Sequence, residues 1–168
     1  MRTKTFVLLA LSAILSICFS LELKSQEEIS VESLEQKTVK ADLIVIGRVI
    51  DAKSSWDETK SNISTYVSLS IEEEIKGHSS KEDIVIRVPG GVVDEIGTRV
   101  PEMASFRKGE RALVFLIRDL RSDYFFVLYG QYGKYEIDQD NMVTSDAVPL
   151  PEFLNEIRQF IPKQKQNR

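Results

Sequence analysis

The chain is poor in the residues that build disulfides and metal centres. It has a single cysteine, Cys18, and a single histidine, His78, in 168 residues. One cysteine cannot form an intramolecular disulfide, and one histidine cannot build a histidine-rich zinc site. We therefore expect packing alone to hold the domain, and we predict no metal and no cofactor.

Basic charge is also scarce relative to acidic charge. The chain has 22 lysines and arginines against 26 aspartates and glutamates, a formal net charge of −4. Proteins that bind nucleic acids grip the phosphate backbone with lysine and arginine. We therefore expect no nucleic-acid partner. The length fits one domain, large enough to bury a core of its own.

The first twenty residues have the pattern of a signal peptide. Arg2 and Lys4 give a cationic start, Phe6–Phe19 is largely apolar, and the small Ser20 suits a cleavage site. The apolar run is shorter than the roughly 20 residues of a membrane span. We predict a signal peptide at residues 1–20 and an exported protein, either secreted or periplasmic in the cell envelope.

Cys18 has two interpretations. Leu15–Cys18 has the outline of a lipobox, which would make the protein a lipid-anchored lipoprotein. The bulky Ile17 stands where that motif needs a small residue, so we favour an ordinary cysteine that is lost with the signal peptide. A membrane partner is expected only if Cys18 is lipidated.

Three further segments are predicted from the chain pattern. Residues 21–40 form a polar leader with a short helix, Ser33–Val39, because Ser33 and Gln36 have capping-box spacing. Residues 41–161 form a β domain that ends in an amphipathic helix, Glu152–Ile161, with Pro151 in its first turn. Residues 162–168 form a disordered tail.

The β domain is read from alternation and turn residues. Leu43–Ile50 is rich in β-branched residues, and Gly47 within it predicts a bulge or sharp bend. Ile63–Ile75 alternates apolar and polar residues, which indicates a half-buried antiparallel strand. Further strands are expected at Ile84–Val88, Val92–Val100 (a loose hairpin), Arg111–Ile117, Tyr124–Tyr129 and Tyr132–Ile137.

The order of three segments resembles a known module. Ala41–Val49 is followed by a long alternating strand that ends at Glu74–Gly77, and later by Phe106–Leu116. This order is similar to the netrin-like module of tissue inhibitors of metalloproteinases. Over residues 41–161 the chain also resembles a group of uncharacterised exported prokaryotic proteins, through Arg87–Gly91 and Gly130–Tyr135.

The resemblance implies a fold but not a mechanism. It implies an OB-like antiparallel barrel of five to seven strands, with a short N-terminal helix and a C-terminal amphipathic helix. The animal inhibitors bind the catalytic zinc through an N-terminal cysteine held by disulfides, and a chain starting at Leu21 has neither. A metalloprotease partner is therefore a third alternative, based on likeness alone.

The ionisable groups do not assemble a catalytic set in the sequence. His78 follows the strand-ending Gly77 and reads as an exposed turn residue. Glu72–Glu74 reads as a solvated strand end, with a calcium site as the alternative. Asp94, Glu95 and Glu102 are read as a mobile polar loop, with cation binding or acid–base work as the alternative. We predict no catalytic residue and a protein that is not an enzyme.

The candidate working surface is the glycine loop. Gly90 and Gly91 let the backbone turn or approach another backbone closely, and barrel geometry alone explains them. The functional interpretation is that the loop of residues 88–102 meets a protein partner together with the barrel face. The candidate interaction residues on this loop and at its base are Arg87, Gly90, Gly91, Asp94, Glu95 and Arg99.

Aromatic residues support an alternative, a carbohydrate or small-ligand binding domain. OB folds offer stacking platforms to such ligands. Tyr66 is the first candidate because it lies on the polar face of its strand, and Tyr132 is the second because it lies between two glycines. The partner's identity and the oligomeric state are not predicted.

Overall fold

The structure, a computed structural model, describes residues 33–57 and 59–161, which belong to one compact unit. The predicted signal peptide with Cys18, the first part of the leader and the predicted tail lie outside the described residues. Within the described ranges, no helix is long and apolar enough to cross a membrane.

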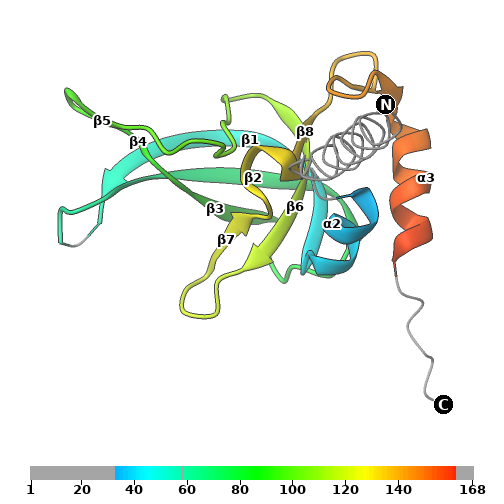
Figure 1. Ribbon diagram of the computed structural model, residues 1–168, viewed down its shortest axis with the longest axis horizontal. Helices are drawn as coiled ribbons and strands as arrows, with labels where there is room; N and C mark the ends of the chain where they lie inside the picture. Colours follow the sequence, from blue (N-terminus) through cyan, green and yellow to red (C-terminus); the bar gives the residue numbers. More distant parts are fainter. Residues whose placement is uncertain (1–32, 58, 162–168) are drawn as a thin grey trace, which may run out of the picture. The chain divides into compact units, whose positions relative to one another are not determined.

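The unit is mainly β with two α-helices, as expected (Figure 1). Most predicted strands are present with ends shifted by one or two residues, but β1 runs to Trp56, six residues beyond the predicted end at Ile50. In chain order the elements are α2 (Leu34–Lys40), β1 (Leu43–Trp56), β2 (Ile63–Lys76), β3 (Asp83–Pro89), β4 (Gly91–Val93), β5 (Ile96–Thr98), β6 (Arg111–Arg118), β7 (Tyr124–Val127), the 3-10 turn η1 (Gly130–Gly133), β8 (Lys134–Glu136), β9 (Met142–Val143), β10 (Val148–Pro149) and α3 (Leu150–Phe160).

Five strands close on themselves in the order β1-β2-β3-β7-β6 and back to β1, and β8 extends the sheet from β6. We call this five-strand circuit the ring. Its pairings are antiparallel except that of β3 with β7, which has two residue pairs, Val85 opposite Tyr124 and Ile86 opposite Phe125. The seam between β3 and β7 is therefore the shortest pairing in the ring.

Strand β1 is apolar from Leu43 to Ile46, where both of its faces are buried. Leu43 and Val45 point into the ring with the inner core, whereas Ile44 and Ile46 belong to a second core outside it. Strand β6 divides its side chains in the same way. Alternation between two cores therefore explains why these segments read as continuous apolar runs.

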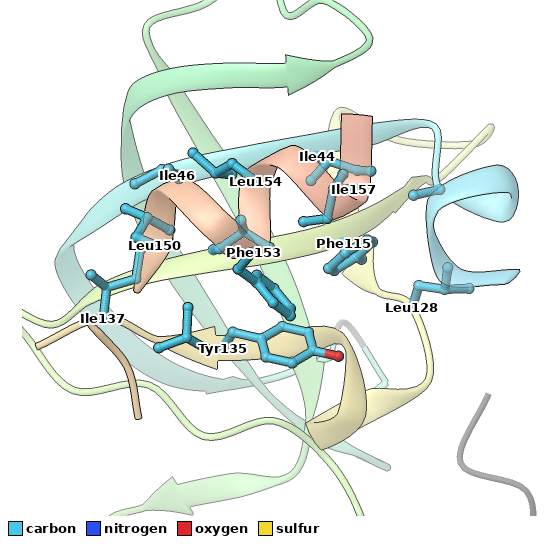
Figure 2. Packing of buried hydrophobic residues seen from close by; sticks show 13 residues of the cluster. Ile44, Ile46, Phe115, Leu128, Tyr135, Ile137, Leu150, Phe153, Leu154 and Ile157 are labelled. Carbon is cyan, nitrogen blue, oxygen red and sulfur yellow. The ribbon is translucent and has the colours of Figure 1, made fainter. Parts of the chain in front are cut away.

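Helix α3 covers the outer core (Figure 2). Its buried side chains, at the i, i+3, i+4 and i+7 spacing of one helix face, are Leu150, Phe153, Leu154 and Ile157. They pack on side chains of β1 and β6, and Pro151 stands in the first helical turn as predicted.

Helix α2 has the predicted capping box. The Ser33 hydroxyl accepts from the Gln36 backbone N–H at 3.2 Å, and the Gln36 side chain accepts from the Ser33 backbone N–H at 3.0 Å. At its other end the Lys76 amine donates to the carbonyl oxygens of Thr38, Val39 and Ala41 at 2.8, 2.9 and 2.6 Å. A lysine from β2 thus satisfies helix-end carbonyls that lack a partner.

The prediction of a bulge at Gly47 is confirmed, whereas one strand prediction is wrong at its start. The β1–β2 register shifts between Ile46 and Gly47, and a Cβ on Gly47 would lie 2.6 Å from the Ser70 carbonyl oxygen, which confirms the predicted bulge. The predicted strand Tyr132–Ile137 is wrong at its start, because Tyr132 lies in η1 and β8 begins at Lys134. Gly130 has a φ of +58° and packs against the Glu102 carbonyl, which turns the chain there.

Candidate interaction groove

The glycine loop becomes a hairpin that starts directly after β3. Gly90 and Gly91 have φ values of +93° and +137°, a region that glycine adopts without steric cost. The Gly90 N–H donates to the Ile63 carbonyl at 2.8 Å, and the Gly90 carbonyl accepts from the Thr65 hydroxyl at 2.8 Å. Strands β4 and β5 then pair across a two-residue loop, Asp94 and Glu95.

The hairpin is seated on the ends of β1 and β2, on the side of the ring away from α3 (Figure 1). The Ser54 and Thr65 hydroxyl oxygens lie 3.0 Å apart, and the Val92 N–H donates to the Ser54 hydroxyl at 3.3 Å. A Cβ on Gly91 would overlap both hydroxyl oxygens. The seat therefore requires glycine at position 91, which supports the geometric interpretation of this residue.

A groove of about 650 Å³ lies between the hairpin and the mouth of the ring. Its floor is apolar: Val67 and Val88 belong to the inner core, and Met103 and Phe106 pack against that core. Segments 97–100 and 102–106 line it as well, so the chain before and after Pro101 contributes to the same groove. The groove is thus an open extension of the inner core.

The rim combines one exposed apolar side chain, Val92, with one unpaired cation, Arg99. Five large apolar side chains of the described residues are exposed, and two of them, Val92 at 65% and Ile96 at 55%, lie on the hairpin. Arg99 is exposed, lines the groove and makes no ion pair within residues 33–57 and 59–161. Such a surface can hold an apolar side chain beside an anion.

The structure brings some of the predicted residues together and separates others. Gly90, Gly91 and Arg99 line the groove, and Asp94 and Glu95 form the exposed hairpin tip. Arg87 lies outside this groove and donates to the Ser64 hydroxyl at 3.1 Å. It borders a separate apolar crevice of about 90 Å³ next to Phe126 and Met103.

The two candidate tyrosines lie elsewhere. Tyr66 is on the outer face of the ring between its cross-strand partners Lys53 and Arg87, and its ring contacts that of Tyr124 edge-on at 5.2 Å. Tyr132 is in η1, and its carbonyl accepts from the Lys37 amine at 2.9 Å. Neither lines the groove.

The strand-end acids are held by different partners. Glu72 pairs with Arg48 at 3.1 Å and with Arg111 at 2.5 Å, and Glu73 pairs with Arg158 at 3.0 Å. Two hydrogen bonds lower the pKa of the Glu74 carboxyl. The larger effect comes from the Ser79 backbone N–H and the smaller one from the His78 side chain. Across the described part of the chain, no group of three or more His, Cys, Asp or Glu residues is placed to hold a metal ion.

Sequence reasoning missed the second wall of the groove. Met103 and Phe106 were not among the predicted interaction residues, and Gln131, which also lines the groove, lies in the unpredicted turn η1. The Gln131 N–H donates to the Glu102 carbonyl at 2.7 Å, which ties this wall to η1. The one weak signal for this wall is that Val100–Phe106 contains apolar residues without the alternation of a strand.

Comparison with known proteins does not add a family. No protein-family model and no curated protein matches the chain. The chemistry of the groove is therefore the basis for interpreting it: an apolar floor, a backbone-rich wall and an exposed guanidinium.

Proposed function

We propose that this protein is an exported, non-enzymatic interaction module that binds a protein partner through the mouth of the ring and the loop of residues 88–102. The observation that carries this proposal is the groove, in which an apolar floor adjoins the exposed Val92 of the hairpin. Contiguous apolar surface with a polar rim is typical of protein-binding sites.

We further propose that the ring is an OB-like barrel. The supporting observation is the pairing order β1-β2-β3-β7-β6-β1, with a parallel seam between β3 and β7. OB folds are partly open five-stranded barrels that use one strand face and neighbouring loops for binding. A co-exported metalloprotease would be one candidate partner, recognised without the zinc-chelating terminus of the animal inhibitors.

The non-enzymatic assignment rests on the surroundings of His78, the one imidazole. Its Nδ1 lies 2.8 Å from a Glu74 carboxylate oxygen, but its side chain is 82% exposed. General bases act in sites that exclude water and hold a substrate near the base. His78 lines neither the groove nor the crevice beside Phe126, which supports a turn-stabilising role.

Photo-crosslinking tests the proposal. A benzophenone amino acid replaces Val92, and a matched control places it at Leu120, which is 95% exposed and outside the groove. We expect position 92 to crosslink a discrete partner in the exported fraction and position 120 to give none. Equal crosslinking from both positions, or from neither, would contradict the assignment.

The outer face supports a second candidate function, binding of a carbohydrate or another small ligand. Tyr66 and Tyr124 form an edge-on pair there, next to Lys53 and Arg87. Aromatic faces flanked by donors suit sugar rings. A glycan array should then give a signal that Tyr66→Ala abolishes and Leu120→Ala retains. No signal from the unmodified protein would end this candidate.

A further inference from the structure

The β4–β5 hairpin leaves one backbone edge free. Val93 and Ile96 flank its two-residue loop, so they exchange the backbone hydrogen bonds of the first pair. Bonded and non-bonded pairs then alternate, which makes Val92 and Gly97 a non-bonded pair. Their N–H and C=O groups consequently point to the two outer edges of the hairpin.

The hydrogen bond of the Val92 N–H agrees with this alternation of bonded and non-bonded pairs. Its N–H donates to the Ser54 hydroxyl on the β1 side, so the N–H and C=O of Gly97 point to the opposite edge. Strand β5 pairs with β4 and with no other strand of the described chain, and all three of its residues are exposed. Gly97 also lines the groove. An unpaired donor and acceptor therefore stand at the groove wall without a side chain in front of them.

We propose that the groove binds an extended segment of a partner protein, which adds as a strand to the Gly97 edge of β5. The segment places an apolar side chain on the floor formed by Val88, Met103 and Phe106, and an acidic side chain beside Arg99. This inference rests on the proposed function and specifies the kind of partner. Main-chain bonds give such complexes affinity, and side-chain pockets give them specificity.

The lining favours an extended segment over other occupants. A docked helix satisfies its own backbone groups and would leave the Gly97 amide unpaired. A purely apolar ligand would leave Arg99 without a counter-charge. An extended chain supplies donors and acceptors at the edge and alternates its side chains, so one side chain can enter the groove while the next points to solvent.

Two substitutions at one position test strand addition. Gly97→Pro removes the outward N–H, whereas the bonds of β5 to β4 use Ile96 and Thr98. Gly97→Ala keeps the N–H, and its Cβ would meet nothing closer than the Val92 Cγ2 at 3.6 Å. Alanine is therefore the matched control for a change of side chain without loss of the donor.

The probe is a displayed library of random nonapeptides, panned against the folded protein, with the enriched peptides measured by fluorescence anisotropy. We expect enriched peptides to combine apolar and acidic residues. Gly97→Pro should weaken them at least tenfold, and Gly97→Ala should stay within twofold. Arg99→Gln should weaken the acidic peptides and Arg99→Lys should retain part of the binding. Circular dichroism checks that all four variants remain folded.

Equal affinity of the proline and alanine variants would overturn strand addition. Enrichment of no peptide, with crosslinking from position 92 intact, would also overturn it and leave the proposed function standing. Loss of that crosslinking as well would contradict both proposals. A dimer in sedimentation that Gly97→Pro alone dissolves would make the occupant a second copy of this chain, which also overturns the inference.

Discussion

The side-chain nitrogen of Lys37 lies 2.6 Å from the phenolic oxygen of Tyr135, and this contact ties α2 to β8. The Tyr135 ring packs against Phe115 at 5.8 Å and Phe153 at 4.8 Å between ring centroids (Figure 2). Burial raises the pKa of Tyr135 to about 12, and desolvation lowers the pKa of the Lys37 amine. A buried polar pair thus joins the N-terminal helix to the outer core.

The raised pKa of Tyr135 predicts a loss of stability in alkali. The unfolded Tyr135 titrates near pH 10 and the folded one near 12, so the folded state keeps its proton longer. That contribution is complete below pH 10 and is lost as the pH rises toward 12. The free energy of unfolding, measured in urea, should therefore decrease more steeply with rising pH for the wild type than for Tyr135→Phe. The difference should reach about 1 kcal/mol at pH 11. Parallel curves would contradict this.

A second buried pair predicts a strong coupling. The Glu110 side chain is 4% exposed, pairs with the Lys134 amine and accepts from the Arg107 N–H at 3.0 Å. Lys134→Met removes the amine and leaves only the exposed Arg107 guanidinium, 3.7 Å from the carboxylate, as a counter-charge, so it should cost about 3 kcal/mol of unfolding free energy. Adding Glu110→Gln should recover part of that loss. Additive effects of the two substitutions in urea unfolding would argue against a coupled pair.

Alanine should destabilise the protein at Gly91 and have little effect at Gly97. At Gly91 a Cβ would overlap the Ser54 and Thr65 hydroxyls at a φ of +137°, so Gly91→Ala should cost about 1–3 kcal/mol. Gly97→Ala should stay within about 0.5 kcal/mol. Hydrogen exchange should show lost protection in β4 for the first variant alone. Equal protection in both variants would mean that the seat does not hold the hairpin.

Local signals predicted the parts of the fold that local chemistry decides. The capping box of Ser33 and Gln36, the bulge at Gly47 and the alternation of β2 each lie within a few residues, and the structure contains all three. The turn η1 was missed because Gly130 turns against the carbonyl of Glu102, a contact between segments far apart in sequence.

The candidate site likewise combines parts that the sequence predicts with parts that it does not. The glycines that turn the chain into the hairpin were visible in the sequence at Gly90 and Gly91. The floor at Met103 and Phe106 depends on where the chain returns across the mouth of the ring, which no local pattern encodes. Val92 and Ile96 carried a strand signal, but their exposure follows from the seating of the hairpin.

Export has its own test, the intact mass of the mature protein. Cleavage after Ser20 should give the mass of a chain that starts at Leu21 and contains no cysteine. An added lipid mass on a chain that starts at Cys18 would establish the lipoprotein alternative. Recovery of the full chain from Met1 would contradict a cleaved signal peptide.

The most direct test of the groove is the affinity of its crosslinked partner for two surface variants. Val92→Asp puts a charge on the exposed hairpin, and Leu120→Asp puts the same charge on an exposed position outside the groove. Isothermal titration should show partner binding at least tenfold weaker for Val92→Asp and within twofold of wild type for Leu120→Asp. Equal affinities for both variants would contradict the account.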